Sequence, residues 1–486
     1  MAFEKSLFLL IVTLLGTWQT EGLCQAVRSK RQPIAEIKPH NGTPTVFLDG
    51  NPTFYGVWWC SPPEKDGWRN AGLGRDNADY TGIHLYAFDV GGAEWSGPGE
   101  GRPSHFDFST VEDRFNQILK EDPKARFHLR VYLERPYSWW LDLYPEEVEI
   151  VSDGTKDRQS FASTVWREQA KEFLRAYIAH LKKIGIAEKI IAYQVGAGHT
   201  GEWVKGKVSM SYWTGDYSAP MRRHFRSWVQ EKYKDDVLAL RAAWGDSTTT
   251  FDSVEVPSDV EQFRTTHWTF RDPRLERNVI DYYRCLADLC SDLVIDYCRT
   301  VKEATEGRSL AGAFYGYLMD LTWNAGFFSE GESSEYSTYQ RSGHLGFVKV
   351  LNSPYVDFLV SPYSYGFRGI GGDGSGMLLT ESLRLHNKVY LYEDDTRTHT
   401  MRSSPFHGRA MSLSESVAFL RRNLAYNVIR GQGLWWLVNQ GHIDVASEPA
   451  FRLMLKEFQE LGTFALNVDH SPGAEIAVIV DDESFF

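Results

Sequence analysis

Eight short apolar segments, separated by longer stretches with helical spacing, organise most of this chain. The segments are 53–59, 83–90, 127–133, 189–195, 310–315, 356–360, 389–392 and 433–438. Helical spacing of apolar residues is found at 221–233, 237–244, 279–302 and 414–429. Alternation of buried strands with helices is typical of a parallel α/β fold. Eight such units predict a (β/α)₈ TIM barrel over residues 45–465, enlarged by its loops.

A doubly wound open sheet is the alternative architecture for the same alternation. Such sheets that bind nucleotides carry a glycine-rich phosphate loop after the first strand, and none follows residues 53–59. The glycine-rich segment 369–376 comes late in the chain and lacks a P-loop lysine. The barrel is therefore the favoured prediction.

The N-terminal segment has the features of a secretory signal. Lys5 precedes an apolar run at 7–15, and residues 24–26 offer a small-residue cleavage site. The run is too short to span a membrane. We therefore predict a signal peptide at 1–26, a secreted or periplasmic protein without a membrane span, and a linker at 27–44.

The C-terminal segment 466–486 contains a second strand-like pattern. Residues 475–480 read Glu-Ile-Ala-Val-Ile-Val after a Pro-Gly pair. A strand of this kind needs a partner. We predict either the start of a truncated C-terminal α/β domain or a strand that pairs at the edge of the barrel.

Composition excludes some functions and favours others. The net charge of −12 argues against a nucleic-acid partner, because phosphate binding needs clustered Lys and Arg. The chain has 16 Trp and 24 Tyr, whose flat rings suit sugar binding as well as core packing. Cys285, Cys290 and Cys298 share one predicted helix without metal-ligand spacing. They are interpreted as buried free thiols, and no metal or cofactor is predicted.

Carboxylates and aromatic residues follow the predicted strands, where a barrel enzyme holds its functional groups. The set is Trp59, Asp89, Glu134, Tyr315, Tyr363, Tyr365, Glu393, Trp435, Trp436 and Asn439. Glu393 begins a run of three acids directly after the strand at 389–392. Paired carboxylates with aromatic platforms are what cleavage of a glycosidic bond requires.

The second carboxylate of such a pair is expected after the fourth strand. Glu202 lies there in a glycine-rich stretch, with His199 and Trp203 as neighbours. Glycines allow the backbone to approach a ligand, and an adjacent Trp would raise the pKa of the carboxyl. The alternative is a loop Glu in solvent.

Three later segments carry a family resemblance. Residues 224–234, 240–245 and 251–257 resemble a helix and Trp-Gly turn of the glycoside hydrolase family 42 β-galactosidases. The resemblance implies a (β/α)₈ catalytic domain, a trimer-forming α/β domain after it, and a retaining mechanism with two glutamates. It implies that Glu393 is the nucleophile and Glu202 the acid/base.

The resemblance also implies supporting roles for aromatic residues. A tyrosine after the sixth strand, Tyr363 or Tyr365, would hydrogen-bond the nucleophile, and Trp435 or Trp436 would form a sugar platform. One position departs from the family pattern. The family usually has Asn-Glu at the end of strand four, where this chain has Gly196-Ala-Gly198.

The functional prediction is a secreted retaining glycoside hydrolase that cleaves β-glycosidic, and as a narrower option β-galactosidic, bonds. Its predicted substrate contacts are Trp59, Asp89, Glu134, His199, Tyr315, Tyr363, Tyr365, Trp435, Trp436 and Asn439. The predicted partners are a glycoside and, where a complete C-terminal domain is present, two further copies in a homotrimer. The missing Asn-Glu pair keeps open a non-catalytic carbohydrate-binding protein on a degenerate barrel.

Overall fold

The computed structural model describes residues 32–60, 73–91, 94–95, 106–134, 138–205, 213–266, 270–321, 338–400, 408–436 and 449–486. The predicted signal peptide at 1–26 and Asn439 lie outside these ranges.

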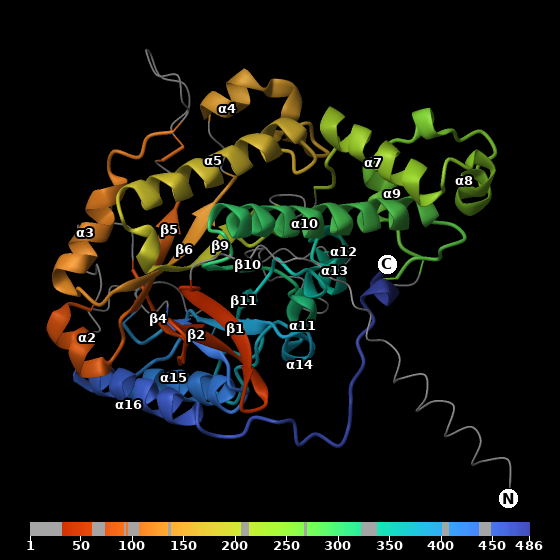
Figure 1. Ribbon diagram of the computed structural model, residues 1–486. Coiled ribbons are helices and arrows are strands. Elements are labelled where there is room, and N and C mark those ends of the chain that lie inside the picture. Colours follow the sequence, from red (N-terminus) through yellow and green to blue (C-terminus); the bar gives the residue numbers. More distant parts are fainter. Residues whose placement is uncertain are drawn as a thin grey trace, which may run out of the picture.

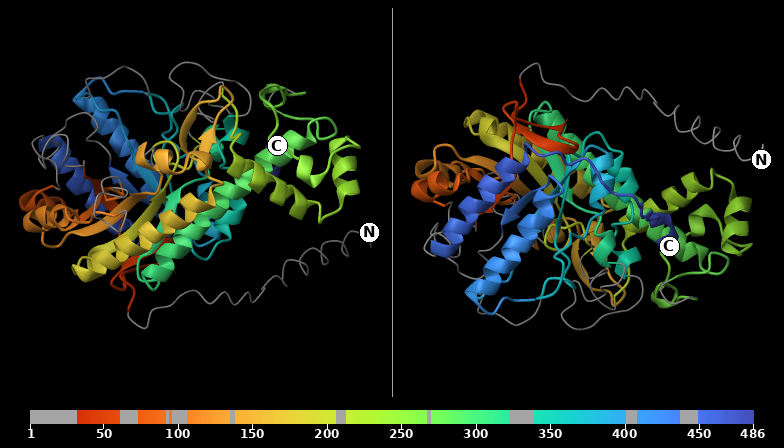
Figure 2. Two further views of the ribbon diagram at one scale, coloured as in Figure 1. Left: turned by 90° about the horizontal axis from the view of Figure 1, so that it is seen from above. Right: turned by 90° about the horizontal axis from the view of Figure 1, so that it is seen from below.

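Eight parallel strands pair in chain order and close into a barrel, which helices surround (Figures 1 and 2). The strands are β4 (Gly56–Trp59), β5 (Leu85–Val90), β6 (Arg126–Tyr132), β9 (Ile190–Gly196), β10 (Leu310–Phe314), β11 (Phe358–Pro362), β12 (Val389–Asp394) and β13 (Gly433–Trp436). All eight predicted strands are present. The prediction of a (β/α)₈ TIM barrel is confirmed, and the open sheet is wrong.

The strand sequences explain why they occupy the centre. All seven residues of β9, Ile-Ile-Ala-Tyr-Gln-Val-Gly, are buried. Every residue of β10, β11, β12 and β13 is buried as well. Strands covered on both faces need apolar side chains in both directions, which gives continuous rather than alternating apolar runs.

Helices surround the barrel wall. They include α2 (Arg75–Thr81), α3 (Val111–Glu121), α5 (Thr164–Lys183), α10 (Arg277–Ala304), α13 (Phe347–Leu351), α14 (Thr380–Leu385), α15 (Leu413–Val428) and α16 (Pro449–Ala465). Further elements are α4 (Ser138–Leu143), η2 (Pro145–Glu147), β7 (Val148–Ile150), β8 (Lys156–Gln159), η3 (Ala187–Lys189), α11 (Leu318–Leu321), α12 (Thr338–Arg341) and η6 (Asp482–Phe485). No helix within the described ranges has the length and apolar character that crossing a membrane requires.

The largest insertion follows β9 and projects from the barrel beside α10 (Figure 1). It contains α7 (Ala219–Lys232), α8 (Val237–Trp244), η4 (Phe251–Ser253) and α9 (Asp259–Phe263). Its polar side chains converge on the buried carboxyl of Asp281 in α10. Tyr233 and Trp244 donate to Oδ2 at 2.7 and 2.9 Å, and Lys232 pairs with Oδ1. The Lys-Tyr and Trp-Gly motif of the resemblance is therefore a structural anchor.

Helix α10 buries the three cysteines predicted to be free thiols. Cys285, Cys290 and Cys298 are buried and free, as is Cys60 in the loop after β4. That prediction is confirmed.

Two antiparallel hairpins precede the barrel, and they correct the predicted linker at 27–44. The strand β1 (Ala35–His40) pairs with β2 (Thr43–Leu48), which pairs in turn with β3 (Asn51–Pro52). Asn41 and Gly42 connect β1 to β2 with φ values of 44° and 81°. Two consecutive left-handed residues make the tight turn that Asn-Gly favours in hairpins.

The predicted strand at 475–480 is not formed. Ile476, Val478 and Ile479 are 84–90% exposed in a segment that runs from α16 across the molecule to the side of α10 (Figure 1). The last residues dock there, since Glu483 pairs with Arg284 of α10 and Phe485 O accepts from Gln340 at 2.6 Å.

Candidate active site

Side-chain alternation along the strands decides which strand-end residues face the barrel interior. His128 of β6 contacts the rings of Phe358 and Trp435, on strands that are not its neighbours, so this face points inward. Residues paired in register on neighbouring strands point to the same face, so the pairing identifies the inward-facing residues of the other strands. At the carboxyl ends of the strands this face presents Trp59, Asp89, Arg130, Gln194, Phe314, Pro362, Glu393 and Trp435.

Three predicted substrate contacts have the opposite parity and point away from the interior. Trp436 packs on Phe458 of α16, with their ring centroids 6.4 Å apart. Tyr315 donates to Gly343 O at 2.7 Å, and Tyr363 stacks on the outward-facing Tyr392. All three side chains are at most 1% exposed. We therefore no longer expect Trp436, Tyr315 or Tyr363 to contact a sugar.

Glu202 reaches the barrel mouth from a tight loop after β9. Gly198 and Gly201 adopt φ values of 76° and 79°. A Cβ on Gly198 would lie 2.5 Å from Val204 O, and one on Gly201 would lie 2.7 Å from the Tyr132 ring. Only glycine fits both positions. The loop leaves Glu202 only 8% exposed, so the alternative of a solvent-exposed loop residue is wrong.

Two hydroxyl groups hold the Glu202 carboxyl. Thr200 donates to Oε1 at 2.5 Å and Tyr317 donates to Oε2 at 2.8 Å. Burial raises the pKa of Glu202 above its ordinary range, against the opposing effects of these hydrogen bonds and of Arg130. A buried carboxyl with a raised pKa keeps its proton and can act as an acid.

Trp203 does not form the apolar wall predicted for Glu202. Its ring stacks on Tyr297 of α10 and its Nε1 donates to Val195 O at 3.0 Å, so it faces the helix layer. The neighbour that touches Glu202 is Tyr317, although the substrate prediction took Tyr315 from this strand end. The sequence signal was Gly316 between the two tyrosines, because a turn there re-aims the second ring.

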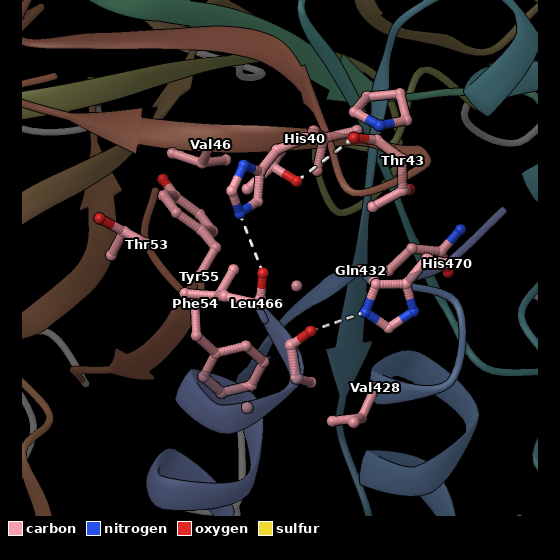
Figure 3. A pocket seen from close by; sticks show the side chains of 17 residues that line it. His40, Thr43, Val46, Thr53, Phe54, Tyr55, Val428, Gln432, Leu466 and His470 are labelled. Carbon is pink, nitrogen blue, oxygen red and sulfur yellow. Dashed lines mark hydrogen bonds between the residues drawn. The ribbon is translucent and has the colours of Figure 1, made fainter. Parts of the chain in front are cut away.

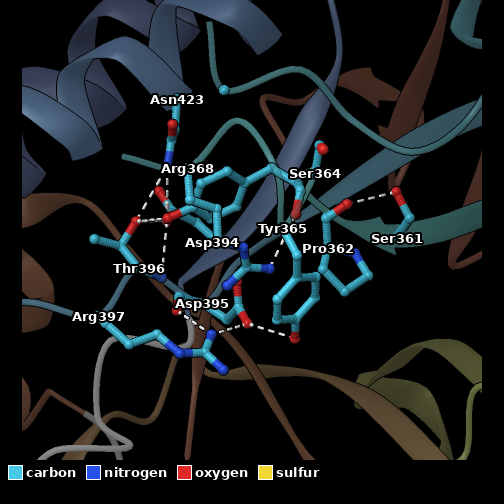
Figure 4. A network of polar contacts seen from close by, with 12 residues as sticks. Ser361, Pro362, Ser364, Tyr365, Arg368, Asp394, Asp395, Thr396, Arg397 and Asn423 are labelled. Carbon is cyan, nitrogen blue, oxygen red and sulfur yellow. Dashed lines mark hydrogen bonds and ion pairs between the residues drawn. The ribbon is translucent and has the colours of Figure 1, made fainter. Parts of the chain in front are cut away.

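The acids after β12 divide between the two faces of the strand (Figure 4). Asp394 points outward, where it accepts from Thr396 Oγ1 at 2.5 Å and from Asn423 of α15 at 3.0 Å. Burial raises its pKa to about 6. Glu393 and Asp395 share the inward parity.

Two arginines and a tyrosine surround Asp395 (Figure 4). Arg368 lies 2.8 Å from Oδ1, Arg397 pairs with Oδ2, and Tyr365 donates to Oδ2 at 3.4 Å. Burial alone would raise the pKa of Asp395, but Arg368 and Arg397 outweigh it and hold the pKa below its ordinary value. Asp395 is thus a fixed negative charge beside Glu393.

Glu393 has its pKa raised well above the ordinary value by burial, then by the charges of Asp395 and Glu202. The two glutamates therefore interact electrostatically across the barrel mouth. The two tyrosines predicted to hydrogen-bond Glu393 have other partners among the described residues: Tyr365 donates to Asp395 and the Tyr363 hydroxyl pairs with Thr396 at 3.0 Å.

A cation and two indole rings line the barrel mouth along the strands from β13, next to Glu393, round to β6. Arg130 forms a two-point ion pair with Asp89, at 2.5 and 3.0 Å, and its guanidinium lies 4.7 Å from the Trp59 ring. Trp59 meets Trp435 edge to face at 4.7 Å. Arg130 was not among the predicted site residues, although a charged residue inside a strand of the barrel indicates a functional position.

The remaining predicted contacts lie in or beside the Glu202 loop. Glu134 is buried and accepts from Gly198 N at 2.9 Å and from Arg158 at 3.3 Å, so it braces that loop. His199 is half-buried within the loop itself. Across the described ranges, no group of three His, Cys, Asp or Glu side chains is placed to hold a metal ion.

A small pocket lies at the opposite, amino-terminal end of the barrel (Figure 3). Its volume of about 30 Å³ holds little more than one water molecule, far below the ~300 Å³ of a typical ligand site. His40 Nε2 and His470 Nε2 donate there to the carbonyl oxygens of Leu466 and Ala465, at the C-terminal end of α16, both at 2.9 Å. The pocket is part of a helix cap and no sugar site.

Comparisons with known proteins identify the relatives of this chain. The family model of glycoside hydrolase family 42, described as β-galactosidase, matches residues 63–342. The β-galactosidase GalA of Bacillus licheniformis is 25% identical over 173 residues, which are 33% of this chain and 22% of that protein.

Solved structures share the fold at low sequence identity. A β-galactosidase from Bacillus circulans sp. alkalophilus superposes with a TM-score of 0.57 and 14% identity, over 85% of this chain and 57% of that one. The catalytic domain of a β-amylase from Paenibacillus polymyxa superposes with a TM-score of 0.60 and 13% identity, over 83% and 97%. The chain thus spans little more than half the length of the β-galactosidase structure. Because the family model covers more than half of the 486 residues, the chain belongs to glycoside hydrolase family 42.

Proposed function

We propose that this protein is a retaining β-glycosidase in which Glu393 is the nucleophile and Glu202 the acid/base. The observation that carries the proposal is the pair of buried, electrostatically interacting carboxyls at the carboxyl end of the barrel strands. Two neighbouring negative charges repel each other, so ionisation of one carboxyl raises the pKa of its partner. At intermediate pH such a pair holds one proton, and the proposed mechanism starts from the state in which Glu202 carries that proton and Glu393 is ionised.

The proposed reaction has two steps. Glu202 gives its proton to the leaving oxygen while the Glu393 carboxylate attacks the anomeric carbon. Glu202, now ionised, removes a proton from water, and that water releases the sugar from Glu393. Retention requires the two carboxyls to lie about 5–5.5 Å apart, against about 6.5–9.5 Å for inversion.

The wall that runs from β13, beside Glu393, to β6 suits a single sugar ring. Trp59 and Trp435 offer apolar faces, while Arg130 and Asp89 offer hydrogen-bonding groups for hydroxyls. The fixed charge of Asp395 favours the positive charge that develops on the sugar ring in the transition state. The substrate class proposed is β-galactosides, because the matching family and its relatives are described as β-galactosidases.

The test is hydrolysis of a panel of aryl β-glycosides, with a maltooligosaccharide included because of the β-amylase similarity. We expect the β-galactoside to be cleaved fastest, and ¹H NMR to show the β-anomer as the first product. An α-anomer as the first product would show inversion and would overturn the retaining mechanism. Cleavage of the maltooligosaccharide alone would overturn the substrate class. If no substrate is hydrolysed but sugars raise the melting temperature of the protein, the protein binds carbohydrate without cleaving it.

Secretion is proposed on the sequence of residues 1–26 alone. Export of the full chain, with N-terminal sequencing of the exported protein, tests both the signal and its cleavage near residue 26. A homotrimer is likewise a proposal, and light scattering of the purified protein measures its mass.

A further inference from the structure

His344 lies between the loop that carries Glu202 and the turn that carries Tyr317. It is fully buried. Its Nδ1 faces the backbone N–H groups of Gly316 and Tyr317 at 3.1 and 3.2 Å. Its Nε2 lies 2.9 Å from the backbone oxygen of Glu202. One imidazole therefore joins the two segments that supply the acid/base and its hydrogen-bond donor.

These contacts determine the protonation of the ring. Backbone N–H groups can only donate, so Nδ1 must carry a lone pair. A carbonyl oxygen can only accept, so Nε2 must carry the hydrogen. The neutral Nε2–H tautomer satisfies all three contacts, and a proton on Nδ1 would break two of them. Burial lowers the pKa of His344 to about 3, in agreement with a neutral ring.

The ring is itself held in place by Tyr315. Their centroids lie 4.9 Å apart, and the Tyr315 hydroxyl donates to Gly343 O at 2.7 Å and accepts from Gly346 N at 3.1 Å. Tyr317 meets the same imidazole edge to face at 4.8 Å. His344 is thus fixed on both sides, which a rigid spacer between two loops requires.

We propose that His344 is a positioning residue, which as a neutral imidazole spaces the Glu202 loop from the Tyr317 turn so that the Tyr317 hydroxyl meets the Glu202 carboxyl. The inference rests on the proposed role of Glu202 as acid/base. His344 acts through Tyr317 and touches no reacting atom.

The proposal has a measurable consequence for the titration of Glu202. A hydroxyl that donates to a carboxylate stabilises the ionised form, so loss of the Tyr317 bond raises the pKa of Glu202. The shift expected for one such bond is about one pH unit. The other groups that act on Glu202 are Thr200, in its own loop, Arg130 of β6, and Glu393 and Asp395 at the end of β12.

The experiment follows the Glu202 carboxyl by infrared difference spectroscopy, with Glu202→Gln to identify its band. We expect His344→Phe to raise the midpoint by about one pH unit. Tyr317→Phe should raise it equally, and the double variant should add nothing further, because both changes remove the same bond. His344→Asn keeps an acceptor near Nδ1 and should give a smaller shift in the same direction.

His224→Phe is the matched control, since this half-buried histidine on α7 has Arg167, Asp288, Asp292 and Lys349 as charged neighbours, and none of these four is a group named above as acting on Glu202. It should leave the midpoint unchanged. Unchanged midpoints in folded His344→Phe and His344→Asn would overturn the proposal, as would additive shifts in the double variant.

The titration needs no turnover, so it is independent of the proposed function. A shifted midpoint in a protein that cleaves no glycoside would keep the positioning role and remove the acid/base assignment. Where the wild type is active, the loss of kcat/KM in His344→Phe should grow as the leaving group becomes poorer, since only poor leaving groups need the acid.

Discussion

The loop after β9 and the end of β12 each bring a carboxyl to the barrel mouth, but they do so by different means. Glu202 sits in a loop that needs glycine at two left-handed positions, and neutral hydroxyls of Thr200 and Tyr317 hold it. Glu393 belongs to the strand itself, and its neighbour Asp395 is held by two arginines. One region orients a carboxyl with hydrogen bonds, and the other fixes charge with ion pairs.

The difference shows how two buried carboxyls in the same site can have opposite pKa shifts. Glu202 and Asp395 are both buried, and burial alone raises the pKa of either. The guanidinium groups reverse this effect at Asp395, while hydroxyl donors do not reverse it at Glu202. Two carboxyls whose environments push their pKa values apart are the pattern that acid and ionised roles require.

The largest expected effect separates the two glutamates by the leaving group. Glu393→Gln removes the nucleophile, and we expect kcat/KM to fall by on the order of 10⁴-fold or more for every aryl glycoside. Glu202→Gln removes the acid, and we expect a loss of about 10²–10⁴-fold that shrinks for activated leaving groups. Steady-state kinetics on a leaving-group series measure both.

Glu172→Gln, on the exposed face of α5, is the control and should keep wild-type kinetics. Equal losses for all leaving groups in Glu202→Gln would contradict its role as the acid and would move the search to Glu134.

The next effect concerns the ion pairs of the β12 region. Arg368→Met leaves the buried Asp395 with Arg397 and the Tyr365 hydroxyl, and we expect a loss of about 3–5 kcal/mol in the free energy of unfolding. The matched control is Arg421→Met, whose ion pair with Glu457 is 58% and 47% exposed and should contribute about 0–1 kcal/mol. Urea unfolding at pH 7 measures both. Equal losses would mean that burial of the Arg368 pair adds nothing.

The fold was predictable because six of the eight barrel strands are fully buried, which leaves continuous apolar runs in the sequence. The strand β1 was missed because the segment 27–44 was predicted as a linker, although Asn41-Gly42 within it is a hairpin-turn dipeptide.

The site was only partly predictable, and alternation explains the errors. Trp435 and Trp436 both end β13, yet they point to opposite faces, and sequence reasoning named both. The same rule would have removed Tyr363. Contacts between loops had no such signal, because Arg368 reaches Asp395 from 27 residues away and His344 reaches Glu202 from 142.

A smaller effect is expected at Asp394, whose pKa is raised while that of its neighbour Asp395 is lowered. The folded pKa of Asp394 is about 6 against an ordinary 3.8, so the folded state binds its proton more tightly than the unfolded state. Its contribution to stability is complete below about pH 4 and is lost as the pH rises through about 6, by about 3 kcal/mol. Asp394→Asn should remove this pH dependence from urea unfolding curves. An unchanged slope between pH 4 and 6 would assign it to another carboxyl.

The smallest expected effect separates the two hydroxyls on Glu202. Thr200 is exposed, and its single hydroxyl hydrogen has two acceptors, Glu202 Oε1 at 2.5 Å and His199 O at 2.7 Å. Tyr317 is buried, so water cannot replace its bond to Oε2. Thr200→Ala should therefore raise the Glu202 midpoint in the infrared titration by less than half of the shift in Tyr317→Phe. An equal or larger shift for Thr200→Ala would show that the loop orients its own carboxyl, and that the turn after β10 is secondary.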